Sequence, residues 1–329
     1  MWFLRQLGSN RLTTNSNTAL SREGGLTGND RKPIKGLGKK RYVGIDIAGP
    51  ESQKFTPEGM KRWQNVYSQT DAKAQADDGT YAFRTHVGEG SPELDADGNV
   101  AQNSPHVEIA NHNAGMIVDT LVGMNERREF SDNVVTRLGH MTHSDFEQLS
   151  KLDPISQEHG VIVEANLTSN LVTGSVPNPD ERDRVLLKFL YQDNLRVTLN
   201  TDGDGVMNTT IDKEYGIAQG AINDFKSGKT TLIDEKGMTI YYYDETQVPH
   251  RIPRNLRKYN HVAIPESKKK NFNIERLEKE SDRYIDDIVP TLGSQKQREE
   301  NLESIAWHRR QNKNNNNTSQ ETTTEQEKN

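Results

Sequence analysis

Five short segments rich in β-branched and apolar residues recur along the middle of this chain, and each ends in polar residues. They cover residues 42–49, 81–86, 134–139, 160–165 and 195–200. Stretches with helical periodicity separate them, for instance 113–124 and 180–191. Strands that alternate with helices are typical of a parallel α/β sheet or barrel, in which the carboxyl ends of the strands carry the active site.

The two ends of the chain differ from this middle part. Residues 1–41 hold nine Lys and Arg against two acidic residues, whereas the whole chain has a net charge of −6. They lack hydrophobic periodicity, so we expect a basic, largely disordered arm, and without a known motif we do not expect nucleic acid as its partner. Residues 266–310 are predicted to form charged helices (274–287 and 295–310), and 311–329 a disordered tail rich in Asn, Thr and Glu.

The region from 42 to 265 is expected to hold the sheet and its helices, with two insertions. Residues 91–112 are turn-rich, and 227–260 contain a predicted hairpin around 239–243. His106 and His112 lie in the first insertion, where we expect a surface feature.

Several classes of protein are excluded by what the sequence lacks. There is no cysteine, which excludes disulfides, thiolate nucleophiles and every Cys-containing zinc site. No apolar run approaches the roughly 18 residues that a membrane helix needs, so we expect no membrane span. The first residues show no apolar stretch of a secretory signal, so a cytoplasmic location is the default expectation.

Polar residues at successive strand ends are the strongest chemical signal. His86 and Glu89 follow the second strand, His140 the third, and Asp202 the fifth. On neighbouring strand tips these side chains would converge on one pocket, and they suit a metal-bound water that attacks an electrophilic carbon. Each residue taken alone is weak evidence for a metal site, since a histidine at a strand end is more often structural. The loop that begins at Asp202 does not match the calcium-binding EF-hand pattern, because Val206 stands where that pattern needs a ligand.

Five motifs in this order resemble the adenosine deaminase family of metal-dependent hydrolases. The resemblance covers roughly residues 42–225. Its motifs are GIDIAGPE (44–51), HVGEG (86–90), RLGHMTH (137–143), VEANLTSNLVTG (163–174) and NTDGDGVMNTTIDKEY (200–215).

The resemblance implies a role for each matching residue. His86 and Asp202 match the family's metal ligands, and the usual metal is zinc. Glu89 matches the proton donor to the purine ring, and His140 matches the histidine that orients and deprotonates the attacking water. Gly49 matches a glycine whose backbone contacts the purine. The implied reaction is hydrolytic loss of ammonia from an adenine nucleoside.

The chain departs from the family in three respects. It has no H-x-H pair, the source of two further metal ligands, and the family's first three strands have no counterpart. We therefore expect an α/β fold, an incomplete TIM-type (β/α) barrel with a C-terminal helical extension. Gly203 stands where the family has a second purine-contacting aspartate, although Asp204 lies one residue later.

Three explanations of the missing strands stay open. A truncated or split product would need a partner chain that supplies the strands, whereas a degenerate relative would be inactive. A rearranged fold would recruit His106, His112 or His143 as replacement ligands. Alternative functions are a non-catalytic binding module and a hydrolase for a different aminopurine.

Overall fold

A computed structural model describes residues 44–93, 104–233, 237–242 and 261–293. Its centre is a five-stranded parallel sheet in which the strands follow one another in chain order, β1 to β5. The strands are β1 (Gly44–Ile47), β2 (Tyr81–Val87), β3 (Val134–His140), β4 (Ile162–Ala165) and β5 (Arg196–Leu199). All five predicted strands are thereby confirmed.

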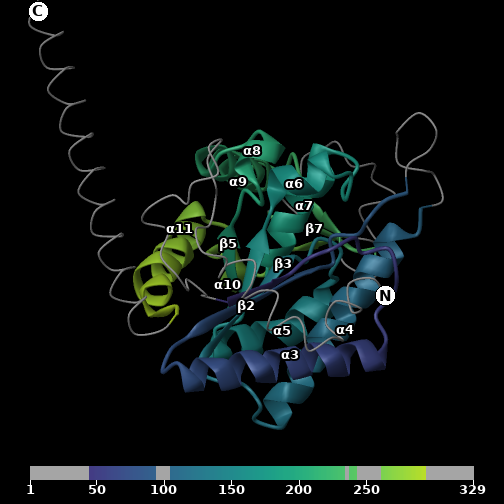
Figure 1. Cartoon of the computed structure of the whole chain (residues 1–329). Coiled ribbons are helices and arrows are strands. Elements are labelled where there is room, and N and C mark those ends of the chain that lie inside the picture. Colours follow the sequence, from purple (N-terminus) through teal and green to yellow (C-terminus); the bar gives the residue numbers. More distant parts are fainter. Residues whose placement is uncertain (1–43, 94–103, 234–236, 243–260, 294–329) are drawn as a thin grey trace, which may run out of the picture.

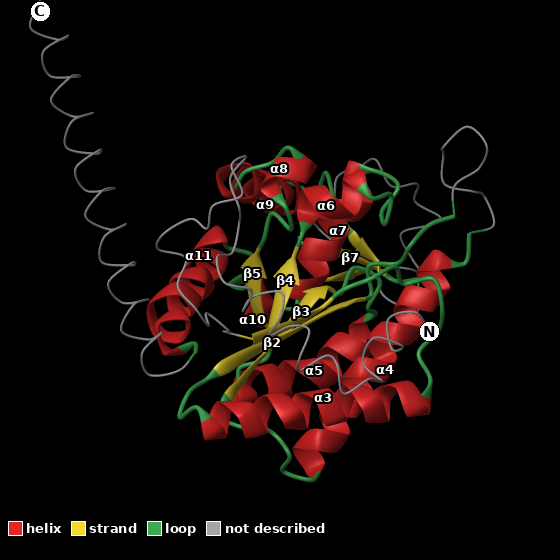
Figure 2. Cartoon of the chain, viewed as in Figure 1, coloured by secondary structure: helices red, strands yellow, loops and turns green. Residues whose placement is uncertain are grey.

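Helices fill the connections between the strands (Figure 1). Figure 2 shows α3, α4 and α5 together on one side of the sheet, and α6, α8 and α9 gathered where the strands end. The helices are α3 (Pro57–Ala76), α4 (His106–Glu126), α5 (Phe146–His159), α6 (Leu167–Val172), α7 (Pro179–Leu190), α8 (Asp204–Met207), α9 (Ile211–Lys226), α10 (Glu266–Lys269) and α11 (Ile274–Arg283). Within the described residues β1 and β5 do not pair with each other, so the fold fits an incomplete TIM-type barrel that is not closed.

Local sequence signals set the ends of these helices. Thr56 caps α3 by accepting a hydrogen bond from the Gly59 amide (3.1 Å), and Pro57 occupies the first turn, where a missing N–H costs nothing. Asp145 and Gln148 form a reciprocal capping box at the start of α5, which ends at Gly160 in the left-handed conformation (φ 67°).

Helix α4 begins earlier than expected. Its first residue is His106 and not residue 113, so part of the stretch predicted as a turn-rich insertion is helical. Fully buried Ala110 and Ala114 continue the apolar stripe backwards by one turn, although the polar residues around them resemble a loop in the sequence. His106 itself is 9% exposed, so its assignment to a surface feature was wrong.

A second, smaller sheet follows α9. It contains β6 (Leu232–Ile233), β7 (Thr239–Tyr241) and β8 (His261–Ala263). β6 pairs antiparallel with β7, as the predicted hairpin requires, and β7 pairs parallel with β8.

The first of the two predicted C-terminal helices is present. α11 covers Ile274–Arg283 and continues as a π-turn over Tyr284–Ile288. It packs against β5, where Glu280 pairs with Arg196. The second predicted helix, the arm at 1–41 and the tail at 311–329 lie outside the described residues. In the part of the chain that is described, no helix combines the length and apolarity needed to cross a membrane.

The five strands present two chemically different faces. On one face, side chains join the apolar core beneath α3, α4 and α5; they are Ile47, Phe83, Leu138, Val163 and Val197. Phe83 meets the rings of Trp63 and Tyr67 edge to face, with centroids 5.0 and 5.4 Å apart. The alternate positions face the other way and include charged residues, namely Asp46, Arg84, Arg137 and Glu164. This charged face leads to the candidate site.

Candidate active site and metal centre

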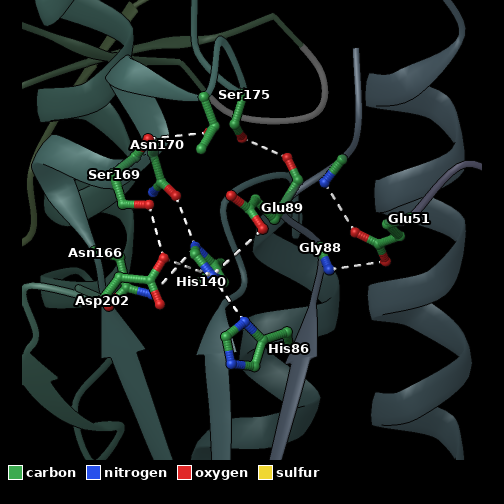
Figure 3. Close-up of polar contacts among 12 residues, drawn as sticks. Glu51, His86, Gly88, Glu89, His140, Asn166, Ser169, Asn170, Ser175 and Asp202 are labelled. Atoms are coloured by element: carbon green, nitrogen blue, oxygen red, sulfur yellow. Dashed lines mark hydrogen bonds and ion pairs between the residues drawn. The ribbon is translucent and has the colours of Figure 1, made fainter. Parts of the chain in front are cut away.

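The ends of three strands bring four of the predicted site residues together (Figure 3). His140 is the last residue of β3, and its Nε2 lies 3.3 Å from Nδ1 of His86 in β2. The same Nε2 is 3.4 Å from Oε2 of Glu89 and 3.7 Å from Oδ2 of Asp202. Two imidazoles and two carboxylates thus converge on one point, as the strand-end argument predicts.

The backbone is strained where these side chains emerge. His140 and Met141 adopt positive φ angles of 70° and 49°, and Asp202 has a φ of 61°. Such angles are unfavourable for residues with a side chain and persist only where surrounding contacts hold them. Here the Met141 amide donates to the Val87 carbonyl (2.9 Å), which ties the turn after β3 to the end of β2.

His140 is fixed in one orientation by groups behind it. Its Nδ1 lies 2.9 Å from Oδ1 of Asn170, an acceptor, and this contact favours the tautomer with the proton on Nδ1, which leaves Nε2 bare toward the site. The side-chain Nδ2 of Asn166, a donor that favours the opposite tautomer, lies slightly farther away, 3.1 Å from the same Nδ1. Burial lowers the pKa of His140, more than Glu89 raises it. A neutral imidazole with a free Nε2 can accept a proton or bind a metal.

Asp202 is oriented by its neighbours on two sides. Ser169 donates a hydrogen bond to Oδ2 (2.8 Å), and the Asp202 amide donates to Oδ1 of Asn200 (3.0 Å). These contacts direct the carboxylate toward His140.

On the side away from the site, the His86 ring contacts two charged residues, Asp46 and Arg84. Its Nε2 lies 3.2 Å from Oδ1 of Asp46 and 2.6 Å from Nη1 of Arg84. Asp46 can accept a proton from Nε2, whereas the Arg84 guanidinium can only donate toward it, so Nε2 has partners of both kinds. Nδ1 faces His140, and a carboxylate behind the ring is common among metal-binding histidines. Burial acts to raise the pKa of Asp46, but contacts with His86 and Arg84 hold it below its usual value.

Glu164 holds the charged face together. Its side chain is fully buried and accepts from Nε of Arg84 (2.6 Å) and Nδ2 of Asn200 (3.1 Å), and it also pairs with Arg137. Arg84 Nη2 lies 3.7 Å from Asp202 Oδ1, so this ion-pair network reaches the site. Sequence analysis missed all of these partners, because the pairing depends on strand register.

The predicted substrate contacts lie at the rim. Gly49 is exposed in the loop after β1, and Asp204 opens α8 two residues beyond Asp202. A cavity of about 450 Å³ is lined by Asp46, Arg84 and Asp202, among other residues. It provides room beside the site for a small molecule.

The proposed replacement ligands do not join the site. His143 donates from Nε2 toward the Ser175 carbonyl (3.0 Å), and burial lowers its pKa to about 4. His106 packs against His143, with ring centroids 5.9 Å apart, while His112 contacts the Phe55 carbonyl (3.2 Å). Of the three explanations left open, the one in which these histidines replace the missing pair gains no support, because each is engaged elsewhere.

The donor atoms present fit a metal ion. His86, Glu89 and His140 each offer one ligand atom, and these atoms all lie within 4.8 Å of one another. Imidazole nitrogens and carboxylate oxygens are ligands that zinc and related divalent ions accept. The chain therefore has a His-Glu-His group that could bind a metal.

Comparison with known proteins agrees with this chemistry over part of the chain. A protein named adenosine deaminase from Lacticaseibacillus casei is 32% identical over 131 residues, which is 39% of this chain and 34% of the relative. An adenosine deaminase from Lacticaseibacillus paracasei matches to the same extent. No family model matches. The chain spans about a third of the length of the curated relatives it matches.

Proposed function

We propose that this chain is a metal-dependent hydrolase of the deaminase type, which converts an adenosine-like nucleoside and water into an inosine-like product and ammonia. The observation that carries the proposal is the convergence of His86, Glu89, His140 and Asp202 at the carboxyl ends of parallel strands. The partial similarity to two adenosine deaminases supports it.

In this proposal His86 and Asp202 would hold a zinc ion, while Glu89 and His140 would act on protons and not as ligands. Zinc, when bound, supplies Lewis-acid chemistry that makes water a stronger acid at neutral pH. His140 accepts a proton from the attacking water at Nε2, the nitrogen left free by Asn170. Glu89 donates a proton to the purine ring nitrogen, which makes the adjacent carbon more electrophilic. The water oxygen bonds to that carbon. His140 passes the proton it accepted to the amino group, which leaves as ammonia, and the remaining hydroxyl proton returns to Glu89 as the carbonyl forms.

The purine would lie beside the charged face. We assign Gly49 and Asp204 to substrate contacts, since Gly49 lies in the loop after β1 and Asp204 opens α8, shortly after β5. Gly203 presents no side chain to a ligand, and nothing lies within 4 Å of the position that a Cβ would take there. A different aminopurine or a nucleotide therefore belongs in any substrate panel.

A partner chain is part of the proposal. Structural zinc sites usually have four protein ligands and catalytic ones three, so His86 and Asp202 alone leave the metal under-coordinated. A strand carrying two histidines could pair with β1, which in the described residues is hydrogen-bonded to β2 alone. The same edge favours a second candidate function, a non-catalytic module that binds another chain.

Zinc titration and ammonia release test the proposal on the 329-residue chain. We expect Glu89→Gln to reduce ammonia release from adenosine by about 10²- to 10⁴-fold while zinc still binds. Asp202→Ala should weaken zinc binding itself. Glu58→Gln, a substitution of an exposed glutamate at the start of α3, is the matched control.

Two results would contradict it. Deamination at the wild-type rate by Glu89→Gln would remove that residue from the chemistry. A stable complex with another chain that contains no zinc, seen by native mass spectrometry, would favour the binding module instead.

A further inference from the structure

A buried carboxylate stands on the far side of the loop that carries Glu89. Glu51 follows β1 and is 8% exposed. Its Oε1 accepts a hydrogen bond from the Gly88 amide (3.0 Å), and its Oε2 accepts one from the Gly90 amide (2.8 Å), as Figure 3 shows. Both oxygens of one side chain thus bind the residues immediately before and after Glu89.

The contact is reciprocal. The amide of Glu51 donates to the hydroxyl of Ser91 (2.7 Å), so the loop after β1 and the loop after β2 hold each other at three points. The Glu51 loop is anchored in turn by Asn113 of α4, which accepts from the Phe55 amide (2.6 Å) and donates to the Gln53 carbonyl (3.1 Å). Glu51 is therefore fixed to a helix that belongs to the core.

Two glycines make this contact possible. Gly88 and Gly90 have φ angles of 70° and 80°, which residues with a side chain rarely adopt. A Cβ at Gly88 would lie 3.2 Å from the Met141 Cα, and one at Gly90 would lie 3.1 Å from the His106 carbonyl oxygen. Both amides face Glu51, while the Glu89 side chain extends to the other side, toward His140.

We propose that Glu51 is a positioning residue, which clamps the two amides beside Glu89 and so sets the place of the Glu89 carboxyl relative to His140. The inference rests on the proposed role of Glu89 as proton donor. Two hydrogen bonds fix the loop more firmly than one, and they are strongest above the pKa of about 7, where the Glu51 side chain is ionised. Ser175 donates to the Glu89 carbonyl from the opposite side, which completes the support of the loop.

Glu51→Gln in the 329-residue chain tests whether Glu51 holds this loop in place. The amide has the same shape, but its NH₂ group faces a backbone N–H, so one of the two bonds is replaced by a clash of donors. Glu58→Gln is the control, because Glu58 is an exposed glutamate. The readout is NMR hydrogen exchange of the Gly88 and Gly90 amides above the pKa of Glu51, together with zinc affinity and ammonia release.

We expect the two amides to exchange about tenfold to a hundredfold faster in Glu51→Gln, with exchange in α3 and β2 unchanged. Ammonia release should lose kcat without a change in KM or zinc affinity. Ser91→Ala, which removes only the reciprocal bond, should give a smaller acceleration and serves if Glu51→Gln does not fold.

Equal exchange of Gly88 and Gly90 in the variant and the wild type would overturn the proposal. So would a uniform acceleration across the whole chain, since that would show a general loss of stability. If the wild-type chain releases no ammonia, the proposed function fails, yet the amide exchange still decides whether Glu51 holds the loop.

Discussion

The two faces of the five-stranded sheet are built from opposite chemistry. Toward α3, α4 and α5 the strands present side chains such as Phe83 and Leu138, which are fully buried in the apolar core. Toward the other side they present Arg84 and Arg137, joined by the fully buried Glu164. The first face stabilises the fold without regard to the site, whereas the second supports the site at a cost in desolvation.

The charged face is not fully satisfied. Among the described residues, Arg84 Nη2 and Arg137 Nε are buried without a hydrogen-bond partner. Unpaired buried donors are rare in folded proteins, since each costs about 1–3 kcal/mol. The charged face therefore keeps polar groups next to the site at a cost in stability.

Among the substitutions that test this comparison, removal of the Glu164 side chain should lower the free energy of unfolding most. Glu164→Ala leaves two partly buried guanidiniums without their shared, fully buried counter-charge, so we expect a loss of about 3–5 kcal/mol in the free energy of unfolding. Urea denaturation measures it. A loss under about 1 kcal/mol would mean that Arg84 and Arg137 reach water instead, and that the charged face is not a core.

Leu138→Ala is the matched substitution on the apolar face. Leu138 pairs with Val163 in the β3–β4 ladder, and Val163 is the residue before Glu164. We expect a loss of about 2–5 kcal/mol from the cavity it leaves. The two faces should differ in how far further substitutions can restore the free energy of unfolding. Replacing Glu164, Arg84 and Arg137 together by Leu, Met and Met should restore most of the stability, since a well-packed apolar substitute avoids the desolvation cost.

The next largest effect on the free energy of unfolding is expected from a change in pH. Burial raises the pKa of Glu51 from 4.5 to about 7, even though the Gly90 and Gly88 amides act to lower it. Between pH 4.5 and 7 the unfolded chain loses this proton while the folded chain keeps it. The stability that Glu51 contributes to the folded state is therefore fully present below pH 4.5 and is lost as the pH rises through 7. The wild type should lose up to about 3 kcal/mol over this window relative to Glu51→Gln, which cannot titrate.

Urea denaturation of both proteins at a series of pH values measures this difference. The apolar face supplies an internal reference, because Leu138→Ala should shift the curve equally at every pH. Parallel curves for the wild type and Glu51→Gln would show that Glu51 ionises as freely in the folded protein as in the unfolded one.

The smallest effect is expected behind His140. Asn170→Ala removes the acceptor of the Nδ1 proton, and we expect a loss of about 1–3 kcal/mol together with a shift of the ring proton toward Nε2. Nitrogen-15 NMR of the histidine rings reports the position of the proton. Asn223→Ala, at an exposed position of α9, is the control; unchanged His140 signals in Asn170→Ala would show that another group fixes the ring.

The strands and the meeting of the site residues could be foreseen because both depend on local patterns. Short β-branched runs mark strands wherever they occur, and the carboxyl ends of parallel strands share one edge of the sheet. His86 and His140 therefore belong together before any coordinates are known. The start of α4 was misplaced because its first turns are polar on the exposed side, and only Ala110 marks the buried one.

Contacts that depend on register or on loop packing could not be foreseen. Arg84 pairs with Glu164 across β3, which requires the exact alignment of β2, β3 and β4. Glu51 binds the Gly88 amide 37 residues away, through two loops whose path no periodicity encodes. The sequence shows which residues are charged, but their partners are decided by the packing.

The order of the strands has a consequence for how the sheet can be assembled. Each strand of the five-stranded sheet pairs with the strand that follows it in the chain. No strand is therefore inserted between two strands that are consecutive in the sequence. The sheet can thus grow serially from either end, with each helix and strand added to a finished border. An extra strand at the β1 border would extend this series without breaking a single existing hydrogen bond, whereas α11 already packs against the opposite border at β5.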